Sequence, residues 1–210
     1  GLAASCGWGR GGWSFATCRQ EAPPWGSRRG QLDDLNRIKS VMERIFVAEP
    51  MLAGNERAYV LDCLDSTWIS SAGKYIERFE QAFADYCGTR HAIATNNGTT
   101  PLHLAPVLLG LKPGDEVIIP TVTYIATANA VRYCGATPVL CDVLEGTMNL
   151  DSAKIEELIT PRTRGIIPVH LYGHPAAMTE VNQLADKHGL WILEDAAEAH
   201  GAEVDGRRVG

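Results

Sequence analysis

The stretch Trp191-Ile192-Leu193-Glu194-Asp195-Ala196-Ala197-Glu198 decides the fold of this chain. Three apolar or aromatic residues predict a short buried strand, and the acidic pair that follows delivers the carboxylate of Asp195 to the strand's carboxyl end. Ligands of open α/β sheets bind at that edge of the sheet. The stretch therefore predicts both a sheet and the edge at which its site lies.

Upstream of this strand, short apolar runs alternate with segments of helical periodicity. Because parallel strands that are buried on both faces are separated by helices, we expect a three-layer α/β/α fold with a mainly parallel sheet. Asp205-Gly206 also predicts a hairpin turn, and Pro106 either kinks its helix or marks a boundary. The expected strands are 91–95, 117–120, 138–143, 165–169 and 190–194, and the expected helices are 54–64, one that carries Phe79 and Phe83 and ends at Gly88, 99–110, 123–133, 151–160 and 178–188.

Composition separates the first 41 residues from the rest. They are rich in Gly, Arg and isolated Trp, and they hold six Lys or Arg against three acidic residues. We interpret 1–41 as an irregular or disordered leader, or as sequence upstream of a start at Met42, and 42–210 as the folded part. The remaining 13 basic and 22 acidic residues argue against a nucleic-acid partner.

The cysteines and the apolar runs exclude other classes of protein. Six cysteines occur without a CxxC pair or clustering with histidine, so neither a metal site nor a disulfide scaffold is predicted. No run approaches the roughly 18 apolar residues of a membrane span, and no secretory signal opens the chain. We therefore expect a cytoplasmic protein without a membrane partner.

Asn97-Gly98-Thr99 follows a predicted strand and opens a predicted helix. Backbone N–H groups at a helix N-terminus favour an anion, and Gly98 permits close approach, so this turn is a candidate phosphate site. The alternative is an ordinary turn with Thr99 as the N-cap. The segment is neither GxGxxG nor a P-loop, which disfavours a nucleotide-binding Rossmann protein.

Three further side chains leave strands at the same edge. Tyr124 follows the strand that ends at Pro120 and has a ring that stacks on a flat heterocycle, although core packing is the alternative. His170 and Tyr172 follow the strand 165–169. They are candidates for the polar lining of a substrate site, and a histidine bonded to backbone is the alternative for His170.

Asp195 and Glu198 are the candidate catalytic residues. A buried carboxylate needs a cationic or donor partner, and a protonated pyridine nitrogen is one such partner. Glu198 lies one helical turn later and faces another edge of the ring or a substrate amine. The alternative is that Asp195 caps the following helix.

From about Phe46 to Gly210 the chain resembles the DegT/DnrJ/EryC1/StrS family of pyridoxal-phosphate-dependent sugar aminotransferases. The resemblance implies the large domain of fold type I, in which Gly98 and Thr99 hold the cofactor phosphate, Tyr124 stacks on the ring and Asp195 pairs with the pyridinium nitrogen. The matching pieces are Trp68 to Lys74 with Phe79-Glu80, Asn97-Gly98-Thr99, Gly114 to Ile118, Pro120 to Ala130, His170 to Gly173 and Glu194 to Glu198.

The resemblance also implies substrates and partners. Glu198 and the stretch Ala48 to Glu80 are similar to the perosamine synthase group, which implies GDP-4-keto-6-deoxymannose as amino acceptor and glutamate as donor, with Trp68 and Ser70 facing substrate. Members of the family are homodimers with active sites at the subunit boundary, so dimerisation is expected of the full-length form.

The family's Schiff-base lysine is expected just downstream of Val209-Gly210. The five lysines of this chain, Lys39, Lys74, Lys112, Lys154 and Lys187, do not stand in its sequence context. We therefore interpret the chain as a truncated large domain that is inactive alone. Two alternatives stay open, a sugar 3-dehydratase with histidine in place of that lysine and a non-catalytic α/β binding module.

Overall fold

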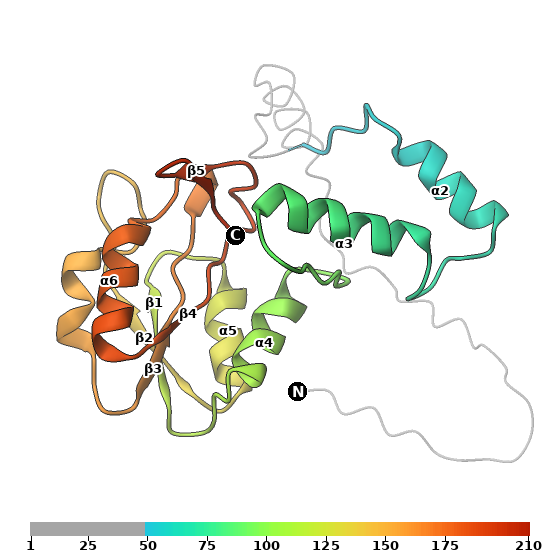
Figure 1. Ribbon diagram of the computed structural model, residues 1–210. Coiled ribbons are helices and arrows are strands. Elements are labelled where there is room, and N and C mark those ends of the chain that lie inside the picture. Colours follow the sequence, from blue (N-terminus) through green and yellow to red (C-terminus); the bar gives the residue numbers. More distant parts are fainter. Residues whose placement is uncertain (1–48) are drawn as a thin grey trace, which may run out of the picture. The chain divides into compact units, whose positions relative to one another are not determined.

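The computed structural model describes residues 49–210. The predicted leader 1–41, the start at Met42 and two of the six cysteines lie outside the described residues. Residues 54–210 form one compact unit built on a parallel sheet, which confirms the predicted α/β class (Figure 1).

Four parallel strands form the sheet, in the order β2-β1-β3-β4. They are β1 (Glu116–Pro120), β2 (Thr137–Cys141), β3 (Thr163–Ile166) and β4 (Trp191–Ile192). All five residues of β1 are buried, as expected for a central strand covered on both faces. Four of the five predicted strands are therefore confirmed, with ends that differ by at most three residues.

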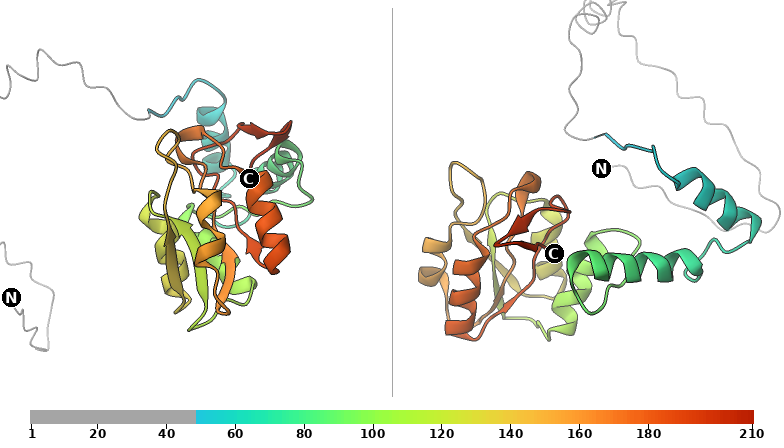
Figure 2. Two further views of the ribbon diagram at one scale, coloured as in Figure 1. Left: turned by 90° about the vertical axis from the view of Figure 1, so that its left-hand side faces the viewer. Right: turned by 45° about the horizontal axis from the view of Figure 1, so that its top comes forward.

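Helices cover both faces of the sheet (Figures 1 and 2). On one face α6 (Met178–His188) packs on Ile118 and Ile166, together with Ile155 and Leu158 from the segment of two short 3₁₀ turns, η1 (Ser152–Lys154) and η2 (Glu156–Leu158). On the other face α5 (Ile125–Tyr133) packs on Val117 and Ile119, and α4 (Thr99–Leu108) packs beside it. The expected three layers are present.

Two helices and a hairpin complete the described part. Helices α2 (Glu56–Asp65) and α3 (Lys74–Cys87) were both predicted, and Gly88 ends α3 in the left-handed conformation at φ 70°. Phe79 and Phe83 stack with centroids 5.4 Å apart on α3. The hairpin pairs β5 (Glu203–Val204) with β6 (Arg207–Arg208) around Asp205-Gly206, as predicted.

Two predicted elements are wrong. Residues 91–95 form no strand, because no described strand lies beside them and the N–H of Ala94 donates instead to the Glu80 side chain at 2.8 Å. The predicted helix 151–160 is the pair η1 and η2. It stops there because the N–H of Thr160 donates to the Thr163 hydroxyl at 2.9 Å rather than to a helical carbonyl.

Pro106 lies inside α4, which resolves the choice that the sequence left open. The helix continues to Leu108 although Pro106 has no N–H to donate. The Pro106 side chain is fully buried, so packing offsets the missing hydrogen bond.

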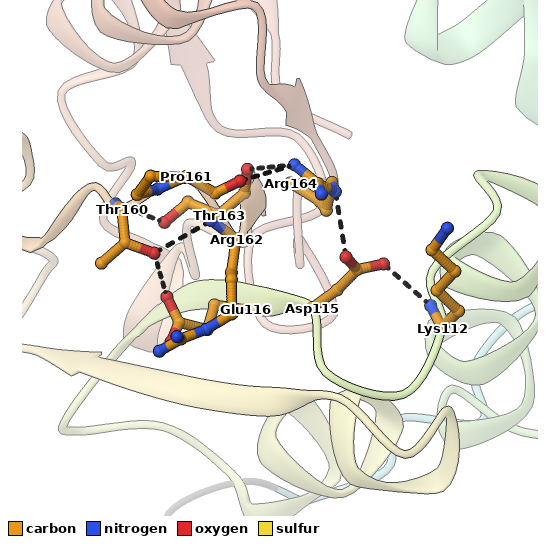
Figure 3. A network of polar contacts seen from close by, with 8 residues as sticks. All are labelled: Lys112, Asp115, Glu116, Thr160, Pro161, Arg162, Thr163 and Arg164. Atoms are coloured by element: carbon orange, nitrogen blue, oxygen red, sulfur yellow. Dashed lines mark hydrogen bonds and ion pairs between the residues drawn. The ribbon is translucent and has the colours of Figure 1, made fainter.

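Ion pairs tie the strands together at the amino-terminal edge of the sheet (Figure 3). Arg164 Nε lies 3.0 Å from Asp115 Oδ1. Two nitrogens of Arg162 donate to Glu116 Oε1, with Nε at 2.9 Å. The Thr160 hydroxyl and the Arg162 guanidinium lower the pKa of Glu116. These contacts join the start of β1 to the start of β3 at the edge opposite the predicted site.

Candidate functional site

Asp195 lies just beyond β4, and its backbone is fixed on both sides. Its N–H donates to the Pro168 carbonyl at 2.9 Å, and its carbonyl accepts from the N–H of His170 at 3.0 Å. These bonds extend the parallel pairing beyond β3 and β4 as an isolated bridge between Val169 and Asp195. Asp195 therefore sits at the carboxyl edge of the sheet, where the sequence predicted it.

The carboxylate of Asp195 is buried, with 8% of the residue exposed. The Thr127 hydroxyl donates to Oδ2 at 2.9 Å, and the N–H of Ala197 donates to Oδ1 at 3.3 Å. The Ala197 bond is the local capping contact of the alternative interpretation. Both donors are neutral, and among residues 49–210 no ion pair includes Asp195. A buried anion held in this way favours a cationic ligand.

The predicted phosphate turn forms the N-terminus of α4. Gly98 is the N-cap residue, and the Asn97 side chain accepts from the N–H of Thr100 at 3.0 Å. Asn97 rather than Thr99 therefore supplies the side-chain cap. Within the described part of the chain the N–H groups of Gly98 and Thr99 have no acceptor, and a Cβ at Gly98 would meet nothing within 4 Å. This open helix terminus is suited to an anion.

The phosphate turn and Asp195 lie at the same end of the unit. A short turn, closed by the bond from the N–H of Leu111 to the Pro106 carbonyl, joins the end of α4 to the start of β1. Helix α4 therefore runs opposite to the strands, and its N-terminus lies at their carboxyl edge (Figure 1). The first turn of α5, which contains Thr127, lies at this edge as well.

Tyr124 is the N-cap residue of α5, next to the threonines that approach Asp195. Its neighbour Thr123 places a hydroxyl 3.0 Å from the Thr127 hydroxyl. Tyr124 is 74% exposed, so it is not a core residue and its ring is accessible. An accessible ring at the start of the helix that carries Thr127 fits the predicted stacking on a flat ligand.

Tyr172 and Glu198 are brought together by a hydrogen bond. Glu198 Oε2 accepts the backbone N–H of Tyr172 at 2.8 Å. Tyr172 adopts a left-handed conformation at φ 50° and ψ 33°, and it is 75% exposed. A non-glycine residue in this conformation is strained and is held by its surroundings. Glu198 thus helps to hold the turn that presents the Tyr172 ring.

Asn149 holds the same turn and was not found from the sequence. Its buried side chain accepts from the N–H of Leu171 at 3.2 Å and donates to the His174 carbonyl at 2.8 Å. Nothing in the local pattern around Asn149 signals this role, because its partners lie more than 20 positions away.

His170 does not line the site, which corrects the expectation of a substrate contact. It is fully buried, and its Nδ1 accepts the N–H of Ala176 at 3.0 Å. With Nδ1 as the acceptor, Nε2 is the donor to Glu194 at 3.2 Å. This bond, with a smaller contribution from the N–H of Gly210, lowers the pKa of Glu194. His170 fixes the turn from behind, as in the alternative interpretation.

Trp68 and Ser70 are not brought to Asp195. They lie between α2 and α3 and line a groove of about 1410 Å³ along those helices. No hydrogen bond or ion pair among residues 49–210 links either side chain to the Asp195 group. Trp68 is 61% exposed, and Ile69 and Phe79 beside it are also exposed.

Other ligand classes find little support in the part of the chain that the structure describes. No group of three or more His, Cys, Asp or Glu side chains between 49 and 210 is arranged to hold a metal ion. Cys63, Cys87, Cys134 and Cys141 are free thiols. Of the helices in this range, none is long and apolar enough to span a membrane.

Comparison with known proteins gives consistent matches. Residues 50–210 match the model of the DegT/DnrJ/EryC1/StrS aminotransferase family. The chain is 61% identical to GDP-perosamine synthase of Caulobacter vibrioides over 171 residues, which are 81% of this chain and 46% of that protein. It is 54% identical to dTDP-3-amino-3,4,6-trideoxy-alpha-D-glucose transaminase of Streptomyces venezuelae over 138 residues, or 66% of this chain and 36% of that one.

A solved structure shares the fold. NtdA from Bacillus subtilis, with bound cofactor PMP, aligns with a TM-score of 0.67 and 34% identity over 79% of this chain and 43% of its own. The chain spans about half the length of the Caulobacter GDP-perosamine synthase that it matches.

Proposed function

The chain belongs to the DegT/DnrJ/EryC1/StrS aminotransferase family, and from this premise we propose that its carboxyl-edge site binds pyridoxal 5′-phosphate for amino transfer to a nucleotide-activated sugar. One observation carries the proposal. Asp195 is a buried carboxylate that, among residues 49–210, only neutral donors hold, so a protonated pyridine nitrogen is the kind of partner it favours.

The other residues at this edge fit the remaining parts of the cofactor. The open N–H groups of Gly98 and Thr99 suit the phosphate, and the exposed ring of Tyr124 suits the face of the pyridine. When bound, the cofactor supplies an electron sink during amino transfer. Asp195 keeps a proton on the ring nitrogen, which strengthens that property.

We assign Glu198 a supporting role. Oε2 already accepts the N–H of Tyr172, while Oε1 has no hydrogen-bond partner among residues 49–210 and is available to a cofactor or substrate group. Tyr172, held in its strained turn, is proposed to contact substrate.

The proposed substrates follow the relatives. A GDP-linked 4-keto-6-deoxy sugar as acceptor and glutamate as donor correspond to the GDP-perosamine synthase similarity. The similarity to a dTDP-sugar transaminase makes a dTDP-linked sugar the competing acceptor. A cytoplasmic location agrees with the free thiols of the described cysteines.

We also propose that the protein acts as a homodimer. The groove between α2 and α3 exposes Trp68, Ile69 and Phe79, and exposed apolar patches mark association surfaces. Light scattering on the purified protein checks this part, and a monodisperse monomer would contradict it.

Pyridoxamine 5′-phosphate (PMP) tests the site directly, because its binding needs no covalent link to a lysine. Three lysines within 49–210 already form ion pairs with acidic residues that are remote in sequence from Asp195. They are Lys74, Lys154 and Lys187. We expect fluorescence titration to show PMP binding by the wild type.

The matched variants are Asp195→Asn and Asp186→Asn, the latter an exposed aspartate on α6. Loss of a charged hydrogen bond is worth about 1.5–3 kcal/mol, so we expect Asp195→Asn to bind PMP roughly 10- to 100-fold more weakly than the wild type. The affinity of Asp186→Asn for PMP should equal that of the wild type. Equal affinity in both variants, or no binding by the wild type, would overturn the proposed function.

A further inference from the structure

The Thr127 hydroxyl is the only side-chain donor, among residues 49–210, that reaches the Asp195 carboxylate. Thr127 is fully buried in the first turn of α5, and its Oγ1 lies 2.9 Å from Asp195 Oδ2 although 68 positions separate the two residues. The N-terminal end of a helix favours a nearby anion. Thr127 thus joins the first turn of the helix to the buried carboxylate.

The protons along this contact have one consistent arrangement. An ionised carboxylate only accepts hydrogen bonds, so the single hydroxyl proton of Thr127 points to Asp195. Thr127 Oγ1 then acts as the acceptor in its 3.0 Å contact with Thr123, and the Thr123 hydroxyl donates along this contact rather than along its longer contact of 3.4 Å to the Tyr124 carbonyl. The two threonines form a directed chain that ends on Asp195 Oδ2.

This arrangement leaves part of the carboxylate available. An aspartate accepts about four hydrogen bonds, and Thr127 and Ala197 supply one to each oxygen of Asp195. Because one of these bonds is made to each oxygen, the two together fix the rotation of the carboxylate plane. The unused acceptor positions therefore have a fixed direction.

Resting on the proposed function, we propose that Thr127 is a positioning residue that holds the Asp195 carboxylate aimed at the cofactor nitrogen. A carboxylate that receives a hydrogen bond has a lower proton affinity. The proton shared between Asp195 and the pyridine nitrogen therefore stays on the nitrogen. Without the Thr127 hydroxyl, the same proton moves toward Asp195 and the ring becomes a weaker electron sink.

The test compares Thr127→Val, which keeps the shape but removes the donor, with Thr127→Ser, which keeps the donor. Thr179→Val is the matched control, because Thr179 makes a 3.0 Å bond of the same chemistry to the exposed Asp205. Each variant of the 210-residue chain is loaded with PMP labelled with ¹⁵N in the ring. The ring-nitrogen chemical shift reports where the proton lies, and a titration gives the affinity.

We expect Thr127→Val to move the ring-nitrogen shift toward that of neutral pyridine and to weaken PMP binding roughly 3- to 30-fold. Thr127→Ser and Thr179→Val should match the wild type. Should Thr127→Val fail to fold, Thr127→Cys provides a weaker donor of similar size and should change both readouts in the same direction.

The outcomes separate this inference from the proposed function. Wild-type binding with an unchanged ring-nitrogen shift in Thr127→Val would overturn the role of Thr127 and leave the cofactor site standing. A shift that Thr127→Ser fails to restore would also overturn it, because the methyl group and not the hydroxyl would then be responsible. Absence of PMP binding by the wild type would reject the function itself.

Discussion

Replacing Gly165 with alanine should destabilise the fold through a clash across β3 and β4. Gly165 lies opposite Trp191 in the parallel ladder, and a Cβ on Gly165 would lie less than 3.0 Å from atoms of the Trp191 indole ring. Real Cβ atoms essentially never approach other atoms so closely, so the ring or the strand must shift. The same pairing leads directly to Asp195, three residues beyond Ile192.

Two opposing effects set the magnitude. Glycine to alanine normally stabilises by about 0.4–1 kcal/mol, because the unfolded chain loses conformational freedom. Overpacking of a fitted site costs about 1–3 kcal/mol. The clash at Gly165 outweighs the entropic gain, and we expect the free energy of unfolding to fall by about 1–2 kcal/mol.

Urea denaturation followed by circular dichroism measures this change. Gly146→Ala is the control, because a Cβ at Gly146 meets nothing within 4 Å, and it should be neutral or slightly stabilising. Adding Trp191→Leu to Gly165→Ala should recover part of the loss, and a double-mutant cycle should give a coupling energy of about 0.5–3 kcal/mol. The reasoning is refuted if Gly165→Ala is as stable as the wild type, since the entropic effect would then act alone.

Three further predictions concern the rest of the described chain. Hydrogen bonding from Thr160 and the charge of Arg162 lower the pKa of Glu116. The ionised Glu116 therefore stabilises the fold fully above its ordinary pKa of 4.5, and this stabilisation is lost as the pH falls through the lowered pKa. Urea denaturation across this pH range should show that the free energy of unfolding falls less steeply with acid in Glu116→Gln than in the wild type. Burial raises the pKa of the Cys141 thiol to about 11, so mass spectrometry should find Cys141 unreactive to iodoacetamide at neutral pH until urea unfolds the protein, and rapid labelling of the native state would contradict this. Asn149→Ala leaves two backbone groups of the Tyr172 turn without partners and should lower the free energy of unfolding by about 1–3 kcal/mol, whereas an unchanged urea midpoint would show that water replaces the side chain.

Elements whose burial follows from local sequence were predictable. The run Glu116 to Pro120 and the turn Asp205-Gly206 carry their structure in a few adjacent residues, and both have the expected form. The predicted strand 91–95 failed because a strand also needs a neighbour, and Ala94 bonds to a glutamate side chain instead. The helix 151–160 failed because a threonine hydroxyl competes for the N–H of Thr160.

The candidate site divides in the same way. Asp195 and the Gly98 turn were predicted as site residues because each follows an apolar run, although only the run before Asp195 forms a strand. Thr127 and Asn149 were not, because each acts on a residue far along the chain, and a buried threonine or asparagine has no local signature until the fold brings its partner near. His170 was misassigned because a strand-end position does not reveal whether a side chain points outward or inward.

The ion pairs of the sheet lie at the opposite end of the strands from the groups of the candidate ligand site. Asp115 with Arg164 and Glu116 with Arg162 join the strand starts, whereas Asp195 and the α4 terminus lie where strands finish. Thermal tolerance and ligand affinity are therefore open to separate engineering. Substituting the pairs at one end shifts the response of the protein to salt and acid, and leaves the groups at the other end unchanged.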